Sequence, residues 1–506
     1  MKINKHISEI INEEPNQRVL KSVNKKIEQA KKFKRRVLAW IAVHFVASIH
    51  HALIAIGFYL LWNYHSYYFL LSLDWSTNQH FLFWFTLWSA IEIGFYIRCI
   101  YLHQKFATRP RAPIFPAEQR KALFKVFLKE FNLKTVAPRW FIPNGSLFSS
   151  KNSEQVTQIS NSNLTQYLSF LFFSSDYLDL SEADKLEIDS YAKEMCEYNK
   201  VTLVEESGPI KCMRLHLDPL TVRHRPFLLY CMISIFQQIG NWRLRQYGFK
   251  RFQSNNGTYT KYWVYLPPST AEDSLSNKKS DQEPIFFVHG IGLGLVMYMK
   301  FIKELTTLDR NRPMILLEIP HVSNKFTRII PNMDQTIEVV DEIYEKHNLT
   351  KCSWVAHSYG TIITSWIIKA RPHHIGKLTL IDPVCFALWE PDLIANFLYH
   401  SPKTPLDVVT RYLFSKELFI ATTLFRNFWW FQNLLLPEEL PSNTAVLLSE
   451  NDSIINSRTV YQYLLKCQSQ LDLKSLTLHF IEGISHGEFL TSSDDKASLV
   501  IQRLNL

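Results

Sequence analysis

An apolar run that ends in a serine between two small residues constrains this chain more than any other feature. Residues 353–356 have the pattern of a buried strand, and 361–370, directly after the serine, have a helical pattern. Ser358 lies at the turn, with Ala356 and Gly360 two positions away on either side. A strand that turns sharply into a helix at a serine is a nucleophile elbow, whose strained backbone requires small neighbours. Alanine stands where the usual pattern has glycine, so the motif needs support from the rest of the chain.

That support comes from a regular alternation of apolar runs and helical patterns beyond residue 258. Continuous apolar strands separated by helices predict a mostly parallel sheet that is covered on both faces. Helical patterns occupy 297–305, 335–347 and 362–370. The predicted strands are 259–266, 284–288, 314–319, 353–356, 377–381, 444–449 and 476–481.

Three of these strands are followed by the residues that a serine nucleophile needs. Ser358 follows strand 353–356, Asp452 follows 444–449 and His486 follows 476–481. Ligand sites of such sheets lie at the carboxyl ends of the strands. A serine hydroxyl requires a base within hydrogen-bond reach, and the base requires an anion that fixes its tautomer. We therefore expect Ser358, His486 and Asp452 to form a catalytic triad.

The order nucleophile, acid, base gives residues 258–506 a clear resemblance to the α/β-hydrolase superfamily. The chain also resembles a eukaryotic, fungal-type subgroup in which an N-terminal membrane anchor precedes the hydrolase. The resemblance rests on five motifs: His289-Gly290, Ala356-His357-Ser358-Tyr359-Gly360, Asp382-Pro383, Asn451-Asp452-Ser453-Ile454 and Ser485-His486-Gly487.

The resemblance implies further roles near the serine. The backbone N–H groups of Tyr359 and Ile291 would form the oxyanion hole, with His289 and Gly290 shaping the second donor's loop. Asp382 is the alternative to Asp452 as the acid, or a structural residue. Glycines at 290, 292 and 294 lack the spacing of a nucleotide-binding fingerprint.

An insertion of about sixty residues between two predicted strands is expected to form a helical cap over the serine. It covers about 384–442, and a loop of this length in a compact domain is usually functional. Its aromatic density predicts an apolar substrate pocket, with Trp389, Phe397, Trp429 and Trp430 as candidates. Residues 428–431 are four consecutive aromatics, which favours contact with substrate or membrane; packing of the cap onto the core is the alternative.

Two apolar segments near the N-terminus predict a membrane anchor. Residues 38–62 contain no Asp, Glu, Lys or Arg, and 81–101 form a second stretch. About 20 residues suffice to span a bilayer. Glu92 in the second segment is costly in lipid, so either it is functional or it is neutral or paired with His50 or His51.

Basic residues on both sides of this pair indicate a hairpin whose two ends face the cytosol. Residues 1–36 hold eleven Lys or Arg and four Glu, and further basic residues follow 101. The intervening loop has one charged residue, Asp74. The endoplasmic reticulum is the membrane we expect. Seven cysteines without C-x-x-C spacing suit reduced thiols in a cytosol-facing protein.

The predicted organisation at 506 residues has four parts. They are a basic tail (1–36), two membrane helices (37–102), a mainly helical linker (103–257) and an α/β-hydrolase domain with its cap (258–506). Within the linker, Ser181 is expected to cap a helix that ends near Tyr198, 117–131 is amphipathic, and 227–236 is a short buried or interfacial helix.

The function predicted is a membrane-anchored serine hydrolase, of the carboxylesterase or lipase kind, that cleaves an acyl ester of a lipophilic substrate. Acyl transfer or thioester hydrolysis on the same triad, and a catalytically silent membrane scaffold, are the alternatives. Membrane lipids and a lipid-like substrate are the expected partners. No cofactor and no metal are expected, and nucleic-acid binding is disfavoured because no basic, aromatic-interleaved motif is present.

Glycosylation mapping tests the predicted topology. The sequons at Asn163, Asn256 and Asn348 would all face the cytosol, so we expect none to carry a glycan in cells. An acceptor site engineered next to Asp74, in the loop on the opposite side, serves as the control and should be modified. A glycan on any of the three native sequons would contradict the hairpin.

Overall fold

The computed structural model describes the chain from Thr77 to Leu506 apart from 144–155, 157, 268–282, 403 and 491–493. Before Thr77 it describes only positions 37, 38, 41, 42, 52, 55, 56 and 59. The described residues fall into two compact units. The larger unit comprises Ile97–Arg223, Phe227–Ser401 and Lys416–Leu506, and the smaller one takes the residues up to Tyr96 with His224–Pro226 and Pro402–Ser415.

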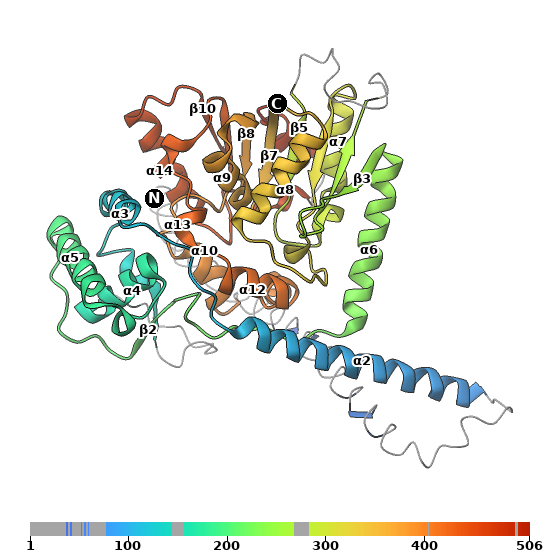
Figure 1. Cartoon of the computed structure of the whole chain (residues 1–506), viewed down its shortest axis with the longest axis horizontal. Helices are drawn as coiled ribbons and strands as arrows, with labels where there is room; N and C mark the ends of the chain where they lie inside the picture. Colours follow the sequence, from blue (N-terminus) through green and yellow to red (C-terminus); the bar gives the residue numbers. More distant parts are fainter. Residues whose placement is uncertain are drawn as a thin grey trace, which may run out of the picture. The chain divides into compact units, whose positions relative to one another are not determined.

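An eight-stranded sheet forms the centre of the larger unit (Figure 1). The strands lie in the order β10-β9-β8-β7-β5-β6-β4-β3, parallel from β10 to β6 and antiparallel at β4 and β3. Their bounds are β3 Phe249–Gln253, β4 Lys261–Tyr265, β5 Ile285–Val288, β6 Met314–Leu317, β7 Cys352–His357, β8 Ile375–Ile381, β9 Thr444–Ser449 and β10 Leu476–Ile481. The predicted mostly parallel sheet is thus confirmed.

Helices cover both faces of the sheet because the central strands are apolar on both. Side chains alternate along a strand, so Phe287 of β5 joins the core under α7 and α15, while Phe286 stacks on Trp354 near α8. The helices and short turns around the sheet are η5 Gly294–Tyr298, α7 Met299–Leu308, η6 Pro320–Val322, α8 Met333–Lys346, α9 Gly360–Ala370, η7 Pro372–His374, α14 Ser457–Gln470, η11 Glu488–Leu490 and α15 Asp494–Ile501.

The strand order reverses between β5 and β7. From β5 the chain adds β6 on one side, and it then crosses to add β7 on the other. The register pairs Val288 with Ala356, so the carboxyl ends of both strands lie side by side. Such a switch point is where open α/β sheets form their ligand sites.

The turn after β7 passes against the end of β5 at very short range. A Cβ atom on Gly360 would lie 2.3 Å from the backbone oxygen of Val288. A Cβ atom on Gly290 would lie 2.7 Å from the Cβ of Ser358. Ala356, where the usual motif has glycine, is fully buried within β7. Alanine is therefore accommodated at the first small position, whereas Gly360 meets backbone atoms that side-chain motion cannot displace.

The region expected to be a linker packs instead as part of the larger unit. The Trp140 indole donates to the Trp389 carbonyl at 2.8 Å, and Arg139 pairs with Glu390 at 2.9 Å. The sheet also begins earlier than expected, since β3 starts at Phe249 rather than beyond 258. The elements of this accessory region are α3 Ala117–Glu130, η2 Ala137–Trp140, β1 Phe141–Pro143, α4 Asn161–Phe173, η4 Tyr177–Asp179, α5 Glu182–Asn199, β2 Ile210–Cys212 and α6 Phe227–Gln246.

Two predicted helices of this region are confirmed and a third is longer than expected. Helix α3 matches 117–131, and α5 begins at the predicted cap, where Ser181 accepts from the Asp184 N–H at 3.2 Å. The predicted helix 227–236 extends to Gln246 as α6. Its polar second half, Gln237 onwards, continues the helix because that half packs on η5 and on Ser323 after η6.

The insertion between β8 and β9 is helical, as predicted for a cap. In the larger unit it contributes α10 Asp392–Ile394, η8 Ala395–Tyr399, α12 Leu418–Arg426, α13 Trp430–Asn433 and η10 Pro437–Glu439. The smaller unit holds α11 Pro405–Thr410 and η9 Arg411–Ser415. Helix α12 contacts η6, which follows β6 at the carboxyl edge of the sheet.

One described helix is long and apolar enough to cross a membrane. It is the stretch Phe83–Ala107 of α2 (Thr77–Ala107), which contains most of the second predicted segment. The first predicted segment, 38–62, lies mostly outside the described residues, as do His50 and His51. Glu92 is 1% exposed, so the protein shields it.

Replacing Gly360 tests the close contact between the elbow and β5. Gly360→Ala puts a methyl group onto the Val288 carbonyl, so we expect a loss of about 1–3 kcal/mol or more in the free energy of unfolding, measured by denaturant titration. Gly208→Ala is the matched control, because a Cβ atom there meets nothing within 4 Å. Equal stability of the two variants would contradict the contact.

Candidate active site

Ser358 has the strained backbone expected of an elbow. Its φ is +52°, in the left-handed region that side-chain-bearing residues rarely adopt. The Ser358 N–H donates to the Ile381 carbonyl at 3.0 Å, which ties the turn to the end of β8. The serine is 7% exposed at the start of α9. The fold thus fixes the position of its hydroxyl.

The structure brings the three predicted triad residues together. His486 Nε2 lies 2.9 Å from Ser358 Oγ, and His486 Nδ1 lies 2.6 Å from Asp452 Oδ2. These residues come from the ends of β7, β9 and β10, which are spaced along one edge of the sheet. With Nδ1–H donating to the carboxylate, Nε2 is free to accept the serine proton.

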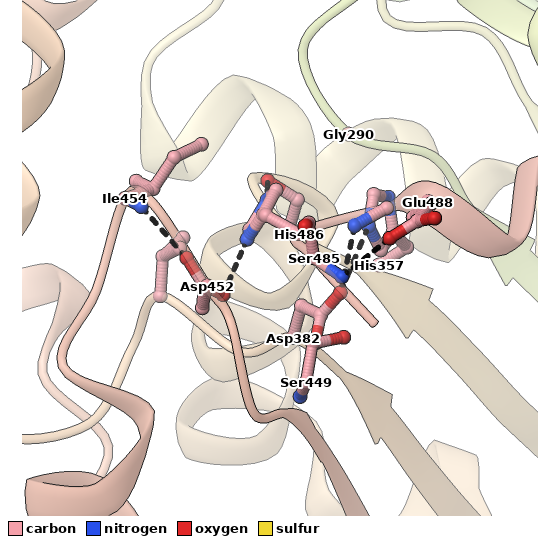
Figure 2. A network of polar contacts seen from close by, with 12 residues as sticks. Gly290, His357, Asp382, Ser449, Asp452, Ile454, Ser485, His486 and Glu488 are labelled. Carbon is pink, nitrogen blue, oxygen red and sulfur yellow. Dashed lines mark hydrogen bonds and ion pairs between the residues drawn. The ribbon is translucent and has the colours of Figure 1, made fainter. Parts of the chain in front are cut away.

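The loop after β9 holds Asp452 in place (Figure 2). Its second oxygen, Oδ1, accepts from the N–H groups of Ile454 at 2.7 Å and Ile455 at 3.0 Å. Both carboxylate oxygens therefore have partners, and the side chain is shielded from water. This arrangement orients Oδ2 toward the imidazole.

Asp382 is a second buried carboxylate in the same network, but it contacts backbone instead of the His486 ring nitrogens. Its Oδ1 accepts from Ser449 N–H and its Oδ2 from Gly487 N–H, both at 2.9 Å. It therefore joins the end of β9 to the loop that carries His486. Burial, together with the Asp452 charge, raises the pKa of Asp382, although the His486 charge and these N–H bonds oppose the shift.

His486 is more basic than an ordinary histidine. Burial lowers its pKa, but the charge of Asp452, the hydrogen bond to it and the charge of Asp382 outweigh burial and raise the pKa to about 9. A carboxylate that stabilises the imidazolium in this way makes the ring a stronger proton acceptor.

Tyr298 is a polar partner that sequence reasoning missed. Its hydroxyl accepts from the Gly290 N–H at 2.9 Å and lies 2.7 Å from His357 Nδ1. Burial lowers the pKa of His357 well below its ordinary value, so a neutral ring can accept a hydrogen bond from the tyrosine hydroxyl. The hydroxyl thus links the loop after β5 to the residue before the serine. Tyr298 lies in an otherwise apolar stretch, and nothing in that pattern distinguishes it from a core residue.

Both ring nitrogens of His289 hold the loop after β5 in place. His289 Nδ1 lies 2.8 Å from the Gly290 carbonyl, and its Nε2 accepts from Ile319 N–H at 3.0 Å. Since Gly290 N–H is used by Tyr298, the next donor along is Ile291. Among the described residues, neither Ile291 N–H nor Tyr359 N–H donates to a protein acceptor. The geometry therefore leaves both N–H groups available, and their role as oxyanion donors stays a prediction.

The same cluster offers the atoms of a small cation site. Ligand atoms of Asp382, Asp452 and His486 all lie within 4.8 Å of one another. However, these carboxylates already accept four backbone N–H groups and one ring N–H. These hydrogen bonds engage all four carboxylate oxygens of the cluster, so each oxygen already has a protein partner.

The cap aromatics contact protein more than expected. Trp429 stacks on His216 with ring centroids 3.8 Å apart, the Trp430 indole donates to the Leu171 carbonyl, and Trp389 packs edge-on against Tyr463. All three indoles are buried, and Phe397 is half-buried. Trp429 and Trp430 thus pack against the accessory region. The expected contact of 428–431 with substrate, membrane or both stays a prediction.

Several solved structures are similar to part of this chain. Naproxen esterase (carboxylesterase NP) from Bacillus subtilis aligns with 53% of this chain over 96% of its own length, at 12% sequence identity and a TM-score of 0.37. Carboxylesterase CesB from the same organism aligns with 54% of this chain over 98% of its own length, at 12% sequence identity and a TM-score of 0.35. A membrane phospholipase A, a bacterial virulence factor, aligns with 55% of this chain over 93% of its own length, at 16% sequence identity and a TM-score of 0.37. No protein-family model matches the sequence, and neither does any curated protein. The strand order, the elbow and the three strand-end residues independently fit the α/β-hydrolase fold expected from the sequence.

The pH profile of ester hydrolysis distinguishes the two acids. His486 must be neutral to act as a base, and its raised pKa moves the acidic limb of kcat/KM above pH 6.5, toward 9. Asp452→Asn removes the main causes of the shift, so the limb should move to lower pH and kcat should fall about 10⁴-fold.

Asp382→Asn is the matched control for this measurement. It leaves the Nδ1 contact intact, so we expect a smaller shift of the limb and a much smaller loss of kcat. The reverse order of effects would make Asp382 the acid.

Proposed function

We propose that this chain is a membrane-anchored serine hydrolase that cleaves an acyl ester of a lipophilic substrate, with Ser358, His486 and Asp452 as its catalytic residues. The observation that carries the proposal is the hydrogen-bonded series from Ser358 Oγ to His486 at 2.9 Å and on to Asp452 at 2.6 Å. It occurs at a strained elbow. This combination of strain and proton relay is specific to nucleophilic serine chemistry.

The proposed reaction proceeds through an acyl-enzyme. Ser358 Oγ attacks the carbonyl carbon of the ester while His486 Nε2 takes its proton. The tetrahedral intermediate then expels the alcohol, which receives that proton from His486. Water, deprotonated by the same ring, attacks the acyl-enzyme, and the acid leaves as Oγ regains its proton. Asp452 stabilises the imidazolium in both halves.

The oxyanion of each intermediate would bind to the N–H groups of Tyr359 and Ile291. Both groups lack a protein acceptor among the described residues. Preorganised donors of this kind contribute about 3–4 kcal/mol each. The contact between Gly290 and Ser358 supports the assignment, since it brings the loop against the nucleophile. A side chain at 290 would separate the two.

The lipophilic substrate class rests on the surroundings of the serine. A helical cap follows β8, and its helix α12 contacts η6 at the carboxyl edge of the sheet, near the triad. One helix in the described part of the chain is long and apolar enough to cross a bilayer. We propose a cytosol-facing catalytic unit on a hairpin anchor, in the endoplasmic reticulum membrane. An enzyme held there meets acyl esters in the bilayer at high local concentration.

A fluorophosphonate probe tests the chemistry. It should label the wild-type protein, and Ser358→Ala should abolish labelling because Ser358 is the only described serine within hydrogen-bond distance of a histidine ring nitrogen. Ser469→Ala, an exposed serine on α14, is the control and should label like the wild type. Equal labelling of wild type and Ser358→Ala would remove the basis for the proposal. The absence of labelling in both would indicate a silent scaffold.

Untargeted lipidomics of cells that express wild type or Ser358→Ala then identifies the substrate. A lipid ester that accumulates with the variant, while its free acid falls, indicates hydrolysis. Accumulation of an ester with loss of a second ester would indicate acyl transfer.

A further inference from the structure

Helix α6 carries an apolar stripe of exposed side chains. Figure 1 shows this helix next to β3. At about 100° per residue, its members lie on one side of the helix within an arc of about 120°. Each is 44–60% exposed, although large apolar side chains at the surface are usually scattered. The stripe consists of Met232, Ile235, Phe236, Ile239 and Trp242.

The charged residues on α6 and on β3, which follows it, are all positive. Helix α6 contains no Asp or Glu. Arg243 lies one helical turn beyond Ile239, on the same side as the stripe, and Arg245 and Lys250 follow. All three are exposed, and none forms an ion pair among the described residues. An apolar face with cations at its end, and a tryptophan near them, is the composition of a helix that lies in the interface of an anionic bilayer.

The opposite side of α6 packs on the loop that leads to the oxyanion hole. Gln237 donates to the Ser323 carbonyl at 2.8 Å and to the Leu293 carbonyl at 3.2 Å. A Cβ atom on Gly240 would lie 2.9 Å from Val296, so the helix and η5 are in close contact. The same η5 ends at Tyr298, whose hydroxyl binds Gly290 and His357. The stripe therefore lies on the opposite side of α6 from η5, the element whose Tyr298 holds the loop that carries Ile291.

We propose that the outer face of α6 docks onto an anionic lipid surface and that this contact holds the catalytic unit, with its oxyanion loop, against the bilayer. The stripe inserts among the acyl chains, while Arg243 and Lys250 bind phosphate groups of the lipids. The docking contact is separate from the anchor, because an anchor restricts distance and the stripe restricts orientation. The consequence for turnover rests on the proposed hydrolase function, whereas the docking itself does not.

Photocrosslinking in the full-length protein identifies what covers the stripe. Phe236 is replaced by p-benzoylphenylalanine, and the protein is reconstituted into phosphatidylcholine vesicles with or without phosphatidylserine. Mass spectrometry of the irradiated protein should find lipid adducts, with a yield that rises with phosphatidylserine. The same replacement at Leu465, which is 44% exposed on α14, is the control and should give few.

Other photoproducts would overturn the proposal. A covalent dimer at Phe236 would mean that a second copy covers the stripe, and a crosslink to another segment of the chain would mean that the protein covers it itself. Lipid adducts that are equally frequent at Leu465 would mean that the contact is unspecific.

The charge contribution is tested with Arg243→Glu and Lys250→Glu combined. We expect the adduct yield on phosphatidylserine vesicles to fall at least about fivefold. Turnover of an ester in those vesicles should fall with it, while hydrolysis of soluble p-nitrophenyl acetate stays unchanged. Lys193→Glu with Lys474→Glu, two exposed lysines elsewhere, is the matched control. An unchanged yield of lipid adducts in the Arg243 and Lys250 double variant would contradict the proposal that these two residues bind lipid phosphates.

Ser358→Ala separates failure of docking from failure of the proposed chemistry. It should give the same adducts as the wild type, because docking requires no nucleophile. Docking without any hydrolysis would therefore contradict the proposed function alone, and hydrolysis without lipid adducts would contradict the docking alone.

Discussion

The close approach of the elbow to the end of β5 is the constraint on which the site depends. Gly360 leaves room for the Val288 carbonyl, and Gly290 leaves room for Ser358. These two contacts fix the serine against the loop that would supply an oxyanion donor. Parallel strands that reverse their order at this point leave two strand ends adjacent, with the next connections leading away on either side. The topology thus creates the opening, and the two glycines bring its walls together.

Two buried carboxylates around one imidazole would be costly if they had the same task. The hydrogen bonds separate their tasks. Asp452 contacts the His486 ring, whereas Asp382 accepts from backbone N–H groups on both sides of it. Asp382 still adds to the raised pKa of His486 through its charge. Asp382, at the end of β8, therefore mainly positions the loop that carries His486, and its charge adds to the raised pKa of that residue. Both carboxylates lie near the imidazole, which explains why both looked like candidates for the acid.

Sequence reasoning succeeded where one residue's role follows from its place at a strand end. Ser358, Asp452 and His486 needed only the strand series and its order, and the structure brings them into contact. It failed where a role depends on a partner far along the chain. Tyr298 acts through Gly290 and His357, and the burial of Trp429 depends on His216. Helix α6 was cut short for the same reason, because its polar half is stabilised by Ser323 and Val296 rather than by an apolar run of its own.

The accessory region explains how a cap with so many aromatics stays ordered. The cap presents indoles at two sides, and only one side can face the sheet. The accessory helices cover the other through the Trp140 bond to Trp389 and the contacts of Trp430 with Phe127 and Phe172. The cap is consequently held between two layers of the same unit. At the edge of the cap, Phe397 is half-buried and Asn396 donates to the Ile454 carbonyl beside Asp452. Under the proposed function, we expect these two positions to influence substrate selectivity more than the buried indoles do.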